Sequence, residues 1–153
     1  PVSHLLIPPR GGVVITLGAI FATADKVLMV EDVSSHDYNT TVTLLVNDAT
    51  NDGWKIPKIH DIGKVLKKHN ADVGGVTIIE FCQPKHAAAV LKLEGGKSVS
   101  SMMPCRVSVY EHDGKVYVSR MNSDLISYLL PIHIGEKIRA ASDEIEAIIA
   151  DVI

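Results

Sequence analysis

Cysteine is scarce in this 153-residue chain, which has only Cys82 and Cys105. Two cysteines are too few for a disulfide scaffold, so they form one bridge or remain two free thiols. Aromatic residues make up 5% of the chain and charged residues 22%, and the net charge is -3. The chain has no basic stripe and few aromatic side chains, which argues against nucleic-acid binding.

Established catalytic motifs are also missing. The sequence has no G-x-S-x-G, no P-loop, no H-E-x-x-H and no G-x-G-x-x-G pattern. It has no C-x-x-C pair, which argues against a structural zinc finger, and no C-x-x-C-H for covalent haem attachment. Motifs therefore assign no enzyme class to the chain.

Charge is absent from residues 11–24. This stretch is too short to span a bilayer as a helix, which takes about 20 apolar residues. It fits either a signal-like or anchor-like segment or an extra β-strand. We expect residues 1–24 to be an apolar extension before a single domain over residues 25–153, with membrane contact only through residues 11–24. A periplasmic or envelope location is the first expectation, and the cytoplasm is the alternative.

What the sequence does contain is alternating strand and helix patterns. Strands are predicted over residues 25–33, 54–60, 74–82, 105–111 and 115–121. Helices are predicted over residues 34–53, 61–70, 85–93 and 134–152, the first of them capped by Ser35 or Asp37. The order β-α-β-α-β-α-β-β-α predicts an α+β fold, with a mixed or antiparallel sheet and helices mainly on one face.

Asp113-Gly114 separates the last two strands and predicts a two-residue hairpin turn. That turn pairs His112 with Lys115 and places Arg120 on the same face as Cys105. A guanidinium near a thiol favours the thiolate, which is both a nucleophile and a soft-metal ligand.

Cys82 ends one predicted strand and Cys105 begins the next. Antiparallel strands would place both thiols at one end of the sheet, whereas a parallel crossover would separate them by roughly 17–20 Å. If the thiols converge, His60, Met102 and Met103 are candidates to join them. Such donors suit a soft transition metal or haem iron.

Structural roles remain open for each of these residues. Free cysteine packs as a small hydrophobic residue, and methionine fills gaps in cores. His60 fits a histidine at a strand end, Trp54 is expected in the core, and His86 is expected at the surface.

Three stretches carry a resemblance to a known family: "TTVTLLVNDATNDGWKIPKIHDI", "EFCQPKHAAAVL" and "MMPCRVSVYEHDGKVYVSRMN". The chain resembles the domain of unknown function 302 family from about Val27 to Val152. The resemblance implies an α+β fold similar to TATA-binding-protein-like domains and association as dimers or larger homo-oligomers. It also implies a cysteine at each of positions 82 and 105, beside Pro84 and Pro104, but no established activity.

Three functional hypotheses follow. The first is an oligomeric binding module that holds a soft metal, haem or another redox-linked ligand near Cys82 and Cys105, with Arg120 beside them. The second is a protein of sulfur transfer or thiol–disulfide exchange. The third is an assembly protein whose cysteines are only structural.

Overall fold

Five strands form one antiparallel sheet in the order β1-β5-β4-β3-β2 in the computed structural model, which describes residues 24–153. The strands are β1 (Met29–Val33), β2 (Ile59–Asp61), β3 (Val76–Phe81), β4 (Cys105–His112) and β5 (Lys115–Met121). The predicted α+β class is therefore confirmed, with the antiparallel form of the sheet. The predictions for residues 1–23, a signal, an anchor or a strand, lie outside the described residues.

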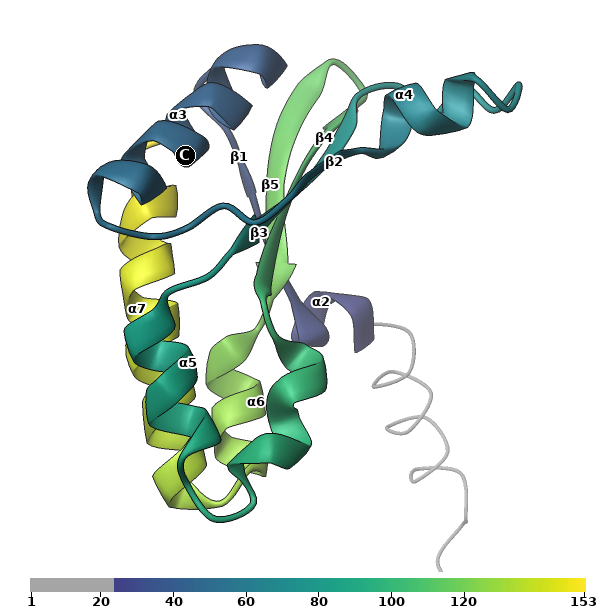
Figure 1. Cartoon of the computed structure of the whole chain (residues 1–153). Coiled ribbons are helices and arrows are strands. Elements are labelled where there is room, and N and C mark those ends of the chain that lie inside the picture. Colours follow the sequence, from purple (N-terminus) through teal and green to yellow (C-terminus); the bar gives the residue numbers. More distant parts are fainter. Residues whose placement is uncertain (1–23) are drawn as a thin grey trace, which may run out of the picture.

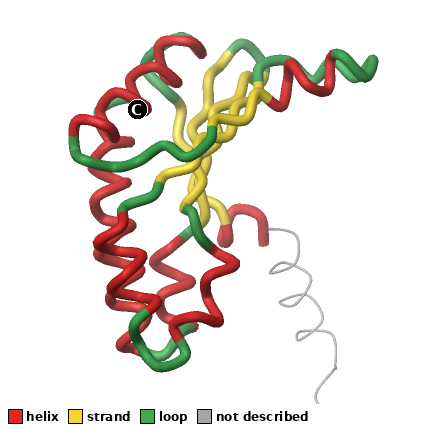
Figure 2. Tube along the Cα trace, in the orientation of Figure 1, coloured by secondary structure: helices red, strands yellow, loops and turns green. Residues whose placement is uncertain are grey.

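Helices α3 and α7 cover one face of this sheet, and α5 packs against α7 on the same side (Figure 1). Figure 2 shows the strands beside this helical layer, with α4 projecting from one end of the sheet. None of the helices described over residues 24–153 is long and apolar enough to cross a membrane. The helices are α2 (Ala24–Leu28), α3 (Tyr38–Asn51), α4 (Ile62–Lys67), α5 (Pro84–Leu91), the 3-10 helix η1 (Gly96–Met102), α6 (Ser123–Leu129) and α7 (Ile132–Ala150).

The strand predicted over residues 25–33 is wrong in its first half, where α2 forms instead. Met29 pairs with Met121, which is the last residue of β5. Residues before Met29 therefore have no strand to pair with and form a helical turn. The Leu28 and Val27 carbonyls of this turn accept from the amide and the side chain of Asn122.

The hairpin register predicted from Asp113-Gly114 is confirmed, since pairs run from His112 and Lys115 to Val107 and Arg120. Asp113 and Gly114 both have positive φ, as the turn requires.

The N-terminus of α3 is capped as predicted, because the Asp37 carboxylate accepts the Thr40 amide at 3.0 Å. This bond satisfies one of the free N–H groups of the first helical turn.

Buried side chains form two clusters. The main core lies between the sheet and helices α3 and α7, and it includes Leu45, Trp54, Ile79, Val109 and Ile149. The smaller core joins Val90 of α5, Val99 of η1 and Ile134 of α7. Close contact of η1 with α5 depends on Gly96, because a Cβ there would collide with the Val90 carbonyl.

Candidate functional site

The end of the sheet where β3 finishes and β4 begins brings the two cysteines together. These strands are antiparallel, and Phe81 pairs with Cys105. Cys82 follows Phe81 directly, so both thiols lie at one end of the sheet, which we call the rim. Both cysteines are free.

The two thiols nevertheless leave the sheet on opposite sides. We call the side under α3, α5 and α7 the covered face, and the other side the open face. Cys105 shares the covered face with Val107 and packs against the main core. Strand alternation places Cys82 with Ile78 and Glu80 on the open face. A disulfide within the chain would therefore require the rim to rearrange, because its geometry needs Cβ atoms that face each other.

A cavity of about 450 Å³ lies at the rim. It is lined by members of both cores, and it extends around the strand ends to the open face. On the covered side its walls include Phe81, Val107 and Ile145, and on the open side they include Ile78, Ser108 and Ser119. The lining is mainly apolar, as in most small-molecule sites.

Every sulfur atom of the chain belongs to a residue that lines this cavity. The sequence has two cysteines and four methionines, and the lining includes Cys82, Cys105, Met29, Met102, Met103 and Met121. Met102 and Met103 pack against the smaller core. Met29 and Met121 are direct cross-strand partners. Sulfur donors therefore approach the cavity from both sides of the rim.

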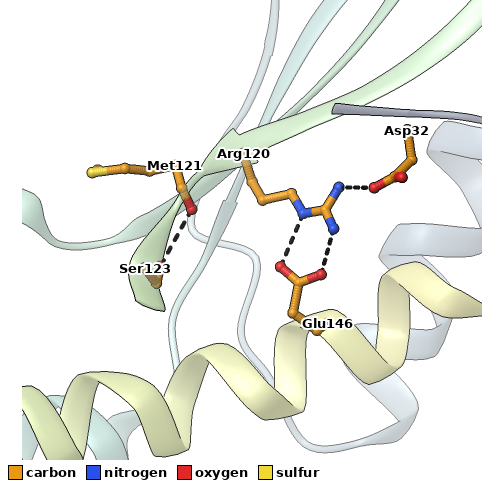
Figure 3. A network of polar contacts seen from close by, with 5 residues as sticks. All are labelled: Asp32, Arg120, Met121, Ser123 and Glu146. Atoms are coloured by element: carbon orange, nitrogen blue, oxygen red, sulfur yellow. Dashed lines mark hydrogen bonds and ion pairs between the residues drawn. The ribbon is translucent and has the colours of Figure 1, made fainter. Parts of the chain in front are cut away.

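Arg120 lies on the covered face as expected, and it lines the cavity. Its guanidinium is paired with two carboxylates (Figure 3). Its Nε donates to Glu146 of α7 at 2.9 Å, and its terminal nitrogens contact Glu146 and Asp32 of β1. Ser123 contacts the Met121 carbonyl beside this network. Arg120 thus ties β5 to β1 and α7.

The surroundings of Cys105 do not favour the thiolate that a nearby guanidinium would stabilise. Burial raises the pKa of the Cys105 thiol, and the neighbouring Cys82 raises it further. A buried thiol is neutral because desolvation disfavours the charged form. The positive charge of Arg120 is already neutralised by Asp32 and Glu146, so it does not offset this burial.

His60 does not line the cavity, although it pairs with Ile78, which does. It is on the open face, and its Nε2 is 3.0 Å from Glu80 Oε1. Ile78 and Cys82 are four positions apart along the extended chain, about 13 Å, so His60 is remote from the cysteines. Met102 and Met103 do line the cavity, whereas His60 does not.

Four residues at this site are not predicted from the sequence. Met29 and Met121 meet through the pairing of β1 with β5, which no local pattern predicts. Trp54 was assigned only to the core, where it is 2% exposed, but it also lines the cavity. His86 was expected at the surface, yet its side chain is 16% exposed and lines the cavity.

Similarity to known proteins agrees with this architecture. A crystal structure of an uncharacterised conserved DUF302 protein from Bacillus stearothermophilus superposes with a TM-score of 0.72. The match covers 80% of this chain and 96% of that chain at 19% sequence identity, so it shows a shared fold. A search of curated proteins gave no match.

Residues 30–152 match the family described as Domain of unknown function DUF302. The chain belongs to this family, which confirms the resemblance carried by the three sequence motifs.

Proposed function

We propose that this protein is a binding module whose rim cavity holds an apolar cofactor with a soft metal centre, of the haem type. One observation carries the proposal: all the sulfur-containing side chains of the chain line a single apolar cavity. Thioethers, thiols and imidazole are the protein groups that coordinate haem iron and soft metal ions.

The size and shape of the cavity favour an extended ligand over a bare ion. A volume of about 450 Å³ falls within the range of small-molecule sites, roughly 300–1,000 Å³. The sulfur atoms approach from both faces of the rim rather than from one point. Among residues 24–153, no group of three or more His, Cys, Asp or Glu side chains is arranged to hold a metal ion.

Neutral donors are the better candidates to coordinate the metal centre. The raised pKa of Cys105 keeps its thiol protonated, which weakens it as a ligand. The Met102 and Met103 thioethers bind a metal without losing a proton, and a neutral imidazole such as that of His86 is also a ligand; all three side chains line the same cavity. We therefore infer that a thioether or the imidazole would hold the metal centre, with the cysteines in the wall.

Thiol–disulfide exchange has less support as a second function. Cys82 and Cys105 lie at the same rim, but strand alternation directs them to opposite faces. A thiol kept neutral by burial is also a poor nucleophile, because the thiolate is the attacking form.

Titration of the purified protein with ferric haem, followed by absorbance, tests the proposal. We expect saturation at one equivalent and a spectrum that differs from that of free haem. Met102→Leu, Met103→Leu and His86→Gln test the donors, and one of them should shift the absorption bands. His60 is not part of the cavity lining, so His60→Gln should leave the spectrum unchanged.

Two outcomes would contradict this proposal. One is a spectrum that stays that of free haem throughout the titration. The other is a bound spectrum that is the same in all three donor variants and in His60→Gln, because the metal would then have no ligand from this cavity.

A further inference from the structure

Trp54 has a buried indole N–H group that no atom of residues 24–153 accepts. Its side chain is 2% exposed, and its Nε1 has no hydrogen-bond partner among residues 24–153. Its backbone is satisfied, because the Trp54 amide donates to the Ala49 carbonyl at 2.8 Å. A buried donor without an acceptor costs about 1–3 kcal/mol, so buried indole N–H groups are normally paired.

The two rings that contact the indole make no hydrogen bond to its Nε1. Phe81 contacts it edge-on, with ring centroids 6.4 Å apart, and His86 lies at 5.8 Å with a tilted ring. All three side chains line the rim cavity. The indole group therefore belongs to a wall of the cavity.

His86, the second ring at this wall, already has a carboxylate partner. Its buried Nε2 atom lies 3.0 Å from Glu144 Oε1. Glu144 also accepts from Lys85 Nζ at 2.8 Å. Among residues 24–153 the indole N–H is therefore the polar group of this wall that lacks a partner.

We propose that the Trp54 indole forms a subsite for a hydrogen-bond acceptor, and specifically for a carboxylate, on an otherwise apolar ligand. The indole nitrogen is only a donor, so its partner must be an acceptor. An ionised acceptor gives a hydrogen bond about twice as strong as a neutral one. The apolar body of the ligand lies along the sulfur-lined part of the cavity. This inference rests on the cavity of the proposed function but not on a metal in its ligand.

A pair of matched probes tests the subsite in the full chain. The probes are 1-pyrenebutyrate, which has a carboxylate, and 1-butylpyrene, which has the same apolar body without an acceptor. Trp54→Phe keeps an aromatic ring and removes the donor. We expect it to weaken pyrenebutyrate binding about tenfold, the effect of a lost hydrogen bond to a charged group, and to leave butylpyrene binding unchanged.

A measurement on the unmodified protein covers the case in which Trp54→Phe does not fold. Trp54 is the only tryptophan, so its indole N–H gives a single proton–nitrogen NMR signal. Pyrenebutyrate should shift that signal downfield, as a new hydrogen bond does, and butylpyrene should not. A bound water molecule on Trp54 would not distinguish the two probes in this way.

The inference is overturned if neither probe binds, if Trp54→Phe affects both probes equally, or if both probes shift the indole signal alike. Its failure is separable from that of the proposed function. Pyrenebutyrate binding with no haem spectrum would reject haem and keep the subsite. A haem spectrum with no discrimination between the probes would reject the subsite and keep haem.

Discussion

The two faces of the sheet differ in how their side chains are used. On the covered face, Ile79, Val109 and Val118 are completely buried, and the one arginine has two carboxylate partners. On the open face, the matching positions of the same strands, such as Ile78 and Tyr110, are only half-buried. The covered face therefore supplies most of the stability, and the sulfur-lined cavity lies where the two faces meet.

This comparison separates the residues that hold the fold from those available for binding. Burial of an apolar side chain stabilises a protein in proportion to the area removed from water. Substitutions on the covered face should therefore cost far more than substitutions of the neighbouring residue on the open face. The β3 and β4–β5 strands offer matched pairs for this test.

Ile79→Ala should have the largest effect on the free energy of unfolding. Ile79 is 0% exposed, so the substitution leaves a cavity in the main core and costs about 4 kcal/mol. Ile78→Ala, one residue away on the open face, should cost about 1 kcal/mol. Urea denaturation measures both values, and equal losses would contradict the division into two faces.

Arg120→Met should cost about 3 kcal/mol, because it breaks a buried ion pair and leaves Asp32 and Glu146 without their partner. This is the lower end of the usual range, since the two carboxylates remain 38% and 41% exposed. Arg106→Met is the control, because Arg106 is 56% exposed and 3.7 Å from Glu80. Its loss should stay below about 1 kcal/mol. Chemical denaturation measures both losses. A larger loss of unfolding free energy for Arg106→Met than for Arg120→Met would contradict this prediction.

Alkylation of Cys105 by iodoacetamide should be slower in the folded protein than in the denatured chain. Burial raises the pKa of this thiol, so less of it is thiolate at pH 8 when the protein is folded. The midpoint of its rate–pH profile should lie higher in the folded state. Peptide mass analysis after timed quenching measures the rate at each cysteine. A folded-state midpoint at or below the denatured one would show that Cys105 is an activated thiol.

Tyr110→Phe should have the smallest effect, about 0.5 kcal/mol. The Tyr110 hydroxyl donates to the exposed Glu31, while the ring stacks on Tyr117 with centroids 5.2 Å apart. The substitution keeps the stacking and removes only the hydroxyl. Burial, helped by Glu31, raises the pKa of Tyr110, so this tyrosine ionises only at high pH. In an absorbance titration of Tyr110→Phe, the part of the tyrosinate signal that appears only at high pH should therefore be smaller. An unchanged titration curve would contradict this assignment.

The sequence predicts most of the fold because its local patterns are strong. The Asp113-Gly114 turn sets the hairpin register, and Asp37 marks the start of α3. Where a predicted element is wrong, the cause is pairing with a segment distant in sequence. The start of β1 is set by where β5 ends, at Met121, so composition alone extends the strand too far.

The candidate site was less predictable than the fold. Both cysteines were identified, but their opposite faces follow from the pairing of β3 with β4. Met29 meets Met121 across strands more than ninety positions apart in sequence, which no spacing pattern reveals. Arg120 was placed on the correct face, but its partners Asp32 and Glu146 come from distant elements.

Fluorescence of Trp54 during a titration with ferric haem tests the central claim most directly, because the only tryptophan of the chain lines the rim cavity. We predict quenching that is complete at one equivalent of haem. Ala87 also lines the cavity, and Ala87→Phe places a bulky ring in it. This substitution should abolish the quenching. Quenching that rises without saturation, or that is unaffected by Ala87→Phe, would contradict a ligand site at the rim.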